Sequence, residues 1–194
     1  CQKLDLEGQS VSGPATEANL VWMDLEMTGL DPEWDRIIEI ATVITDSDLN
    51  VVVEAPPIVV KQSDALLAGM DEWNTTHHGE SGLIDQVRAS EVTERMAEER
   101  TLKFLMDHIK ASDSPLCGNS IGQDRRFLVR YMPRVESFLH YRNLDISTIK
   151  ELAARWRPEV HQAVTKNGVH RALDDVYESI DELRHYRATF FRID

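Results

Sequence analysis

The sequence is poor in cysteine, in long apolar runs and in positive charge. Its two cysteines, Cys1 and Cys117, cannot build a disulfide framework, and neither lies in a C-x-x-C spacing typical of zinc or redox sites. No apolar run approaches the roughly 18 to 20 residues that a membrane-spanning helix needs, and no charged-then-apolar leader opens the chain. We therefore expect a soluble, cytoplasmic protein in a reducing compartment, with no membrane partner.

The shortage of positive charge limits the class of nucleic acid that the protein can bind. Lysine and arginine number 21 against 34 aspartates and glutamates, which gives a formal net charge of −13. Binding to a long nucleic acid is driven by lysine and arginine side chains that neutralise phosphates. The composition therefore argues against a surface for a long strand, but it leaves room for a very short nucleotide held by metals and a few local donors.

The length and composition fit one α/β domain with a proper core. The chain has 194 residues, of which 42% are hydrophobic, and it contains no internal repeat or low-complexity tract. The opening stretch QKLDLEGQSVSGPATEA is polar. We expect residues 1–18 to be a disordered tail or a remnant of expression, and residues 19–194 to form a single domain.

Three stretches rich in β-branched residues predict strands at about residues 20–27, 36–45 and 51–61. The turns between them are short and polar, which indicates an antiparallel meander. Pro56 and Pro57 interrupt the third stretch, so that strand should lie at a sheet edge or contain a bulge.

The remaining chain is mostly helical in pattern. Apolar spacing predicts helices over 63–78, 91–109, 123–131, 148–156 and 171–190, with short strands at 115–118 and 144–146. Strands followed by alternating helices and short strands predict an α/β fold with a mixed sheet flanked by helices.

Asp24 and Glu26 lie two residues apart in the first predicted strand, so their side chains project from the same face. Burying unpaired negative charge costs on the order of several kcal/mol, and such a pair therefore normally binds a cation. Oxygen-only ligands suit Mg²⁺ or Mn²⁺ better than Zn²⁺. A D-x-E alone is also common at exposed strand ends, so this pair needs support from elsewhere in the chain.

Two later segments contain residues that would complete a metal centre. Asp124 follows a Gly-Asn turn, and His170, Asp174 and Asp175 stand near the start of the last predicted helix. Carboxylates around two divalent ions, with a histidine as general base, are what two-metal phosphodiester hydrolysis requires. Taken separately, Asp124 also reads as a solvated acid, and the Asp174-Asp175 pair as helix N-terminal acids favoured by the dipole.

The order and wording of these segments carry a family resemblance. D-x-E on a first strand, the aspartate of GNSIGQDRRFL and the histidine and aspartate of HRALDD resemble the three motifs of the DEDDh family of 3′-to-5′ exonucleases. The longer stretches VWMDLEMTGLDP, CGNSIGQDRRFLVRYMP and HYRNLDISTIKELAARW are similar to members that degrade short oligoribonucleotides. The similarity extends from about Leu20 to Arg187. It implies a ribonuclease H-like fold and hydrolysis of dinucleotides and slightly longer RNA to nucleoside 5′-monophosphates.

The resemblance also implies a metal site. Two divalent ions, Mg²⁺ or Mn²⁺, would be held by four carboxylates, with His170 as the base: Asp24, Glu26, Asp124 and Asp175. The choice of Asp175 rests on the family spacing, because a helical wheel would pair His170 with Asp174 at i and i+4. If His170 lies on a loop, the wheel does not apply.

Further residues gain a role in substrate binding from the resemblance. Leu30 and Trp73 would flank the bases, where stacking is worth about 1 to 3 kcal/mol per base, although both also look like core residues. Tyr141 would act as a catalytic residue by reaching the active site of a second subunit in a homodimer. His78 would contact substrate, although His77 is an equal choice from the local sequence. The 5′ phosphate would be capped by four residues that can donate hydrogen bonds: Ser120, Arg142, Ser147 and Thr148.

Two other functions remain open at this stage. A DEDDh exonuclease that acts on longer RNA or DNA ends would need a basic surface interleaved with aromatics, of which the sequence has no evident trace. A nuclease-like module that binds nucleotides without cutting them would lack a metal carboxylate or the histidine. Neither is missing here.

Overall fold

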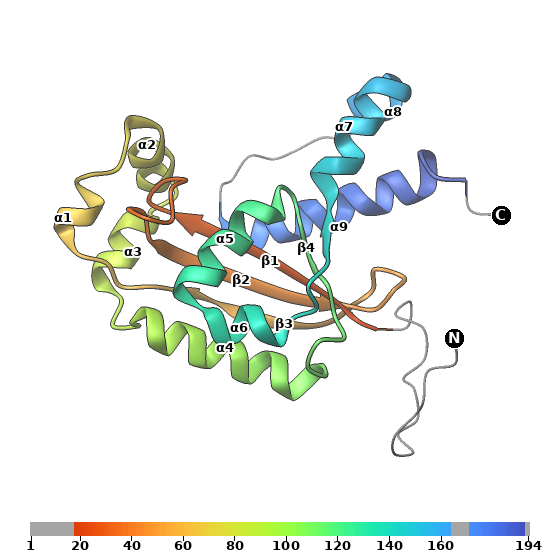
Figure 1. Cartoon of the computed structure of the whole chain (residues 1–194). Helices are drawn as coiled ribbons and strands as arrows, with labels where there is room; N and C mark the ends of the chain where they lie inside the picture. The colour runs from red at the N-terminus through yellow and green to blue at the C-terminus, as the bar shows by residue number, and fades with distance from the viewer. Residues whose placement is uncertain (1–17, 164–170, 193–194) are drawn as a thin grey trace, which may run out of the picture.

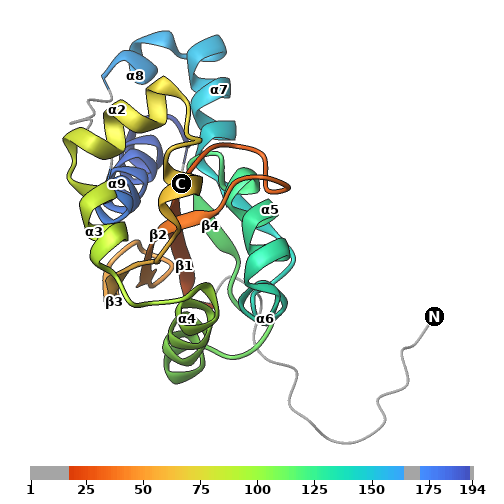
Figure 2. The same cartoon turned by 90° about the vertical axis from the view of Figure 1, so that its left-hand side faces the viewer.

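The computed structural model describes residues 18–163 and 171–192 and places a five-stranded sheet between two groups of helices (Figures 1 and 2). The expected tail therefore lies outside the described residues, except for Ala18. Within the described ranges no helix combines the length and apolar character needed to cross a membrane.

The sheet is mixed, as the sequence predicts. Its strand order is β3 (Val51–Val59), β2 (Ile37–Thr45), β1 (Leu20–Met27), β4 (Leu116–Gly118) and β5 (Asn143–Asp145). The first three strands form the expected antiparallel meander, and β4 and β5 continue the sheet parallel to β1. The carboxyl ends of β1, β4 and β5 therefore meet at one edge, where open α/β sheets usually bind their ligands.

The two prolines of β3 lie in an edge strand that contains a bulge, as the sequence predicts. β3 pairs with β2 and lies at the end of the sheet. Ile40 is opposite Ile58 and Thr42 is opposite Ala55, so two residues of β3, the prolines, face a single residue of β2. This is a bulge, which accommodates the missing N–H groups at a sheet edge.

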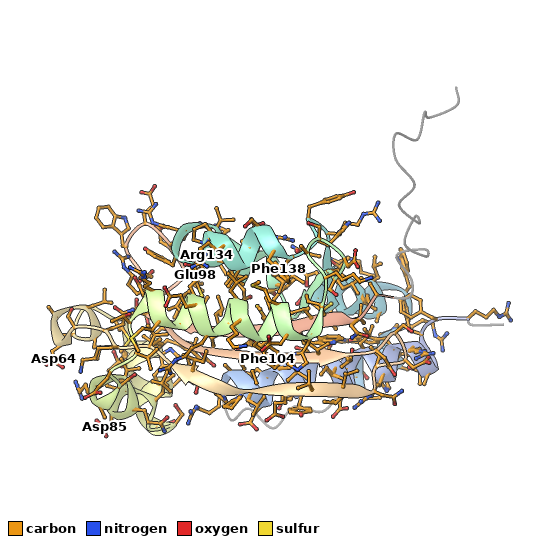
Figure 3. The ribbon with its side chains drawn as sticks, turned by 90° about the horizontal axis from the view of Figure 1, so that it is seen from below. Asp64, Asp85, Glu98, Phe104, Arg134 and Phe138 are labelled. Carbon is orange, nitrogen blue, oxygen red and sulfur yellow. The ribbon has the colours of Figure 1, made fainter. Side chains whose placement is uncertain are left out.

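Strand β1 divides its side chains between two hydrophobic cores. Val21, Met23 and Leu25 pack with α4 (Glu94–His108), α5 (Ile121–Tyr131) and α6 (Pro133–Phe138) on one face. Figure 3 shows this side of the molecule and labels Phe104 of α4 and Phe138 of α6, which pack against the same core. Trp22 packs on the other face with α9 (Ala172–Thr189) and with the helices α7 (Ile146–Trp156) and α8 (Pro158–Gln162). Alternation therefore turns Asp24 and Glu26 toward α9.

Several helices differ from the sequence prediction. The helix expected over 63–78 is divided into α1 (Asp64–Leu67) and α2 (Glu72–Glu80), because Ser63 and Asp71 each cap a new helix start.

Other helix starts also differ from the prediction. Helices α6 and α8 begin at Pro133 and Pro158, which the prediction treated only as helix stops, although proline is favoured in the first turn. Helix α3 (Leu83–Ala89) was not predicted. Helix α7 begins two residues early, since Asp145 caps it.

Candidate metal centre and the surrounding surface

Three carboxylates from two distant parts of the chain converge at the carboxyl end of β1. Asp24 and Glu26 come from the strand, and Asp175 comes from the first turn of α9, which crosses that face of the sheet. One oxygen of each lies within 4.8 Å of the others, and all three residues are half-buried. Asp174, the alternative left open by the sequence, is exposed. The structure thus brings Asp175 to the β1 pair.

Asp124 reaches the same strand from α5. The pairing of β4 with β1 covers Val21 and Trp22 only, so the amides farther along this edge of β1 need another partner. Asp124 is buried, and its Oδ1 accepts a hydrogen bond of 2.9 Å from the Leu25 amide. It does not belong to the group of three converging carboxylates. Its charge nevertheless raises the pKa of Asp24, which places it within electrostatic reach of the site.

The carboxyl groups of this site resist ionisation. Burial, followed by repulsion from Asp124, Glu26 and Asp175, holds the pKa of Asp24 well above its ordinary value. Burial and the charge of Asp175 raise the pKa of Glu26 to about 8. Burial likewise raises the pKa of Asp124 to about 7, although the Leu25 amide opposes the shift. A site built from repelling, oxygen-only ligands fits a hard divalent cation, whose charge would relieve the repulsion.

The two adjacent histidines of α2 have different surroundings. His78 is 1% exposed, and its Nε2 lies 3.0 Å from the carbonyl oxygen of Met27, at the end of β1. Its Nδ1 is 3.9 Å from Glu26 Oε2. His77 is half-buried, and its ring stacks on Trp73 with 4.0 Å between centroids. His78 is therefore the histidine that lies beside the acidic centre.

Leu30 and Trp73 are surface residues, and their interpretation as core residues is wrong. Leu30 is 71% exposed and Trp73 is 55% exposed. The backbone at Leu30 is held firmly, because its carbonyl oxygen accepts hydrogen bonds from Gln123 Nε2 at 2.5 Å and Arg126 Nη1 at 3.5 Å. Both donors come from α5, the helix that carries Asp124. Contact of these two apolar side chains with bases stays a prediction.

A second polar group, which we call the serine corner, consists of Ser120, Ser147 and Thr148. Ser120 begins α5 with a left-handed backbone (φ 52°), and its amide donates to Ser147 Oγ at 2.9 Å and Asp145 Oδ1 at 3.0 Å. The two serine hydroxyl oxygens are 3.1 Å apart. Thr148 follows on α7 and is exposed. The starts of α5 and α7 therefore meet at Asp145, whose carboxylate accepts hydrogen bonds from the Ser120 and Ser147 amides.

Arg142, the fourth expected phosphate contact, lies away from this corner. It directly precedes β5, its carbonyl oxygen accepts from the Leu116 amide, and Asp145 follows three residues later, about 10 Å along the strand. Its guanidinium carbon lies 5.5 Å from the centroid of the Tyr141 ring, and Tyr141 is 75% exposed. Within one chain, the structure does not bring Arg142 to Ser120 and Ser147.

Sequence reasoning assigned no role to two residues that shape this surface. Arg125 donates to the carbonyl oxygens of His140 at 2.8 Å and Tyr141 at 3.0 Å, and so fixes the segment that displays Tyr141. Glu39 accepts a hydrogen bond from the Ala172 amide at the start of α9. The one available signal was that Glu39 is a lone acid in the apolar run RIIEIATVIT. The expected base, His170, lies outside the described residues.

Comparison with known proteins gives consistent matches. The exonuclease model RNase_T matches residues 21–183. Oligoribonuclease of Shewanella loihica is 60% identical over 179 residues, which cover 92% of this chain and 99% of that protein. Oligoribonuclease of Marinobacter nauticus is 62% identical over 174 residues, with 90% and 97% covered. The enzyme of the same name from Klebsiella pneumoniae is 58% identical over 179 residues, with 92% and 99% covered.

Solved structures agree with the fold at much lower identity. A structure of exonuclease I aligns with a TM-score of 0.71 at 17% identity, over 89% of this chain and 41% of that chain. Exonuclease I of Methylocaldum szegediense aligns with a TM-score of 0.66 at 20% identity, over 89% and 41%. The present chain therefore spans about two fifths of the length of these structures, and the likeness establishes the fold, which is ribonuclease H-like.

Proposed function

The chain belongs to the exonuclease family and, within it, to the oligoribonucleases, and from this premise we propose a 3′-to-5′ exoribonuclease that hydrolyses short oligoribonucleotides to nucleoside 5′-monophosphates. The observation that carries the proposal is the convergence of Asp24, Glu26 and Asp175 at the carboxyl end of β1. The similarity to oligoribonucleases supports short RNA as the substrate, and the three carboxylates support a metal-dependent hydrolysis at this place.

The metal ligands that we propose are the carboxylates of Asp24, Glu26, Asp124 and Asp175. Two divalent ions, Mg²⁺ or Mn²⁺, would stabilise the charge on the attacking and leaving oxygens when bound. The chain itself fixes the positions of these carboxylates through β1, α5 and α9. His170 would take the proton from the attacking water, a role that suits an imidazole near neutral pH. His78, which lies beside Glu26 at the end of β1, would contact the substrate.

The restriction to short substrates follows, in this proposal, from the serine corner. Its hydroxyl groups stand at two helix starts, where they would bind a terminal 5′ phosphate. Leu30 and Trp73, both exposed, would enclose the bases between that phosphate and the metal centre. A chain that continued beyond the phosphate would have to pass through the corner.

A homodimer would complete the site. Tyr141 and Arg142 stand side by side on the surface, away from their own chain's serine corner. We propose that both reach the partner subunit, Tyr141 at the reaction centre and Arg142 at the 5′ phosphate. The prediction can be checked by mixing inactive Asp175→Asn and Tyr141→Ala chains. About a quarter of wild-type activity should return, because half of the dimers are mixed and each of these has one complete site. Failure of an exchanged mixture to regain activity would refute the role in trans.

The proposed function is tested with purified protein, Mn²⁺ and a ribodinucleotide. The wild type should release nucleoside monophosphates, and Asp24→Ala should not, because it removes a carboxylate from the centre of the site. Asp174→Ala is the matched control, since Asp174 is an exposed acid next to Asp175. Equal activity of the Asp24 variant would remove the basis for the assignment, and binding without hydrolysis by the wild type would favour a binding module instead.

A further inference from the structure

Glu39 is a further acidic residue beside the Asp24–Glu26 pair, and it does not belong to the group of converging carboxylates. Glu39 of β2 stands directly opposite Glu26 in the antiparallel register and is 1% exposed. Two like charges directly opposite each other destabilise a sheet, and a buried carboxylate needs a partner. Glu39 therefore has to be explained by what it binds.

Its partners lie at the start of α9. Arg171 Nε lies 3.2 Å from Oε1 and 3.1 Å from Oε2 of Glu39, and Nη2 lies 2.5 Å from Oε1. The backbone amide of Ala172, the first residue of α9, donates to Oε2 at 3.1 Å. Arg171 is the N-cap residue of α9 and makes no side-chain cap of its own. A carboxylate from the sheet thus takes the place of the usual capping side chain, at the helix end that favours negative charge.

The same arginine extends the connection to a third element. Arg171 Nη2 donates to Gln86 Oε1 of α3 at 3.1 Å. Asp175 follows Arg171 by one helical turn, and its amide donates to the Arg171 carbonyl oxygen at 3.0 Å. The contacts of Glu39 and Arg171 therefore connect the first turn of α9, which carries Asp175, to β2 and α3.

We propose that the Glu39–Arg171 pair is a positioning unit for the metal centre: it holds the start of α9 so that Asp175 faces Asp24 and Glu26. This rests on the proposed metal site. Neither residue is a ligand in this proposal, and each acts through Asp175. Losses of this kind, in groups that orient metal ligands, typically cost roughly 10- to 100-fold in metal affinity.

Glu39 and Arg171 carry opposite charges, so a positioning role and a purely electrostatic role predict different effects of the two substitutions on Mn²⁺ affinity. If the pair acted only through its charge, Glu39→Gln would weaken Mn²⁺ binding, but Arg171→Gln would strengthen it, because a positive charge near Glu26 would be lost. If the pair positions Asp175, both variants weaken Mn²⁺ binding. Arg171→Gln is therefore the decisive variant.

A matched control for damage to a helix cap exists on the opposite side of the sheet. Glu98 of α4 is 8% exposed, and its Oε1 accepts a hydrogen bond of 2.8 Å from the Arg134 amide in the first turn of α6. Figure 3 shows the two residues next to each other, where α4 meets α6. Glu98→Gln thus removes the charge of a buried carboxylate that caps another helix, without touching the metal centre.

The experiment is a calorimetric Mn²⁺ titration of metal-free protein for wild type, Arg171→Gln, Glu39→Gln and Glu98→Gln, with thermal unfolding of each. We expect Mn²⁺ affinity to fall roughly 10- to 100-fold in the first two variants and to stay within about twofold in Glu98→Gln. Turnover at saturating Mn²⁺ should recover to within about threefold of wild type, since the ligands remain.

Three results would overturn the inference. Tighter Mn²⁺ binding by Arg171→Gln would show that the pair acts only through its charge. Unchanged Mn²⁺ affinity in both Arg171→Gln and Glu39→Gln would show that the pair has no role in metal binding. An equal loss in Glu98→Gln would assign the effect to general destabilisation. If one substitution prevents folding, Arg171→Lys replaces it, because it keeps the charge and loses the guanidinium fork. Failure of the proposed function would look different, because wild type itself would then bind no Mn²⁺ or hydrolyse no dinucleotide.

Discussion

The acidic centre and the serine corner lie at the same end of the sheet, yet they are built in opposite ways. The acidic centre brings together half-buried carboxylates whose pKa values are raised by burial and mutual repulsion. The serine corner offers neutral hydroxyls at the starts of α5 and α7, where the Ser120 and Ser147 amides already donate to Asp145. One region gathers negative charge, and the other offers neutral hydroxyl groups. In the proposed function, therefore, hydrolysis and the recognition of the substrate's end are carried by separate parts of one site.

The largest expected effect comes from breaking the acidic centre. Asp175→Asn should lower turnover about 10³-fold on every substrate, because stabilisation by a bound ion is worth several kcal/mol and each 1.4 kcal/mol is about tenfold. Steady-state hydrolysis of dinucleotides with and without a 5′ phosphate measures this. Asp174→Asn should stay near wild type. A large loss in Asp174→Asn together with an active Asp175→Asn would reverse the ligand assignment.

A smaller effect is expected where the bases would lie. Trp73→Ala should raise the KM for a dinucleotide by about 5- to 140-fold, since stacking contributes about 1 to 3 kcal/mol per base and each 1.4 kcal/mol is about tenfold. Trp73→Phe should recover part of that loss. Trp156→Ala is the control, because Trp156 is also an exposed tryptophan but ends α7. An unchanged KM in Trp73→Ala would remove the proposed base contact.

The serine corner should discriminate between substrates rather than abolish activity. Ser147→Ala should raise the KM for a 5′-phosphorylated dinucleotide by about tenfold, the value for a hydrogen bond of about 1.5 kcal/mol to a charged group. A dinucleotide with a 5′ hydroxyl should change little. The ratio of the KM values for the two dinucleotides, measured on one preparation, reports the loss of phosphate binding and does not depend on the amount of folded protein. A uniform change in both would contradict a phosphate site here.

The smallest predicted effect is a pH dependence of metal binding. In the metal-free protein Glu26 titrates near pH 8 and Asp124 near pH 7, so a metal must displace protons below these values. Raised carboxyl pKa values also make the metal-free protein lose stability as pH rises from the unfolded values near 4 toward 8. The increase in Tm caused by saturating Mn²⁺ should therefore be greater at pH 8.5 than at pH 6. Scanning calorimetry measures the Mn²⁺-dependent increase in Tm at both pH values, and an equal increase at pH 6 and pH 8.5 would contradict the prediction.

Sequence reasoning succeeded where a simple period governs the chain. Alternation along β1 places Asp24 and Glu26 on one face, and the prolines of β3 mark an edge strand with a bulge, as predicted. The convergence of Asp175 on that face could not be derived from periodicity, because it depends on the path of α9 across the sheet. Only the family resemblance selected it over Asp174.

The remaining differences come from contacts between distant segments. Glu39 looks like an ordinary strand residue until the register places it opposite Glu26 and below the start of α9. The distance of Arg142 from the serine corner follows from the pairing of β5 with β4, which no local pattern predicts. The helix expected over 63–78 is divided because Ser63 and Asp71 both act as N-caps, and the apolar spacing alone does not show that a second helix starts at Asp71.

The most direct test of the account is the turnover of a 5′-phosphorylated ribodinucleotide against that of an RNA of about twenty nucleotides, in Mn²⁺ and with the wild-type protein. The separation of an acidic centre that cuts from a serine corner that binds the end of the substrate predicts faster turnover of the dinucleotide. Ser147→Ala should narrow that difference. Equal or faster turnover of the longer RNA by the wild type would contradict the account and favour an exonuclease for longer strands.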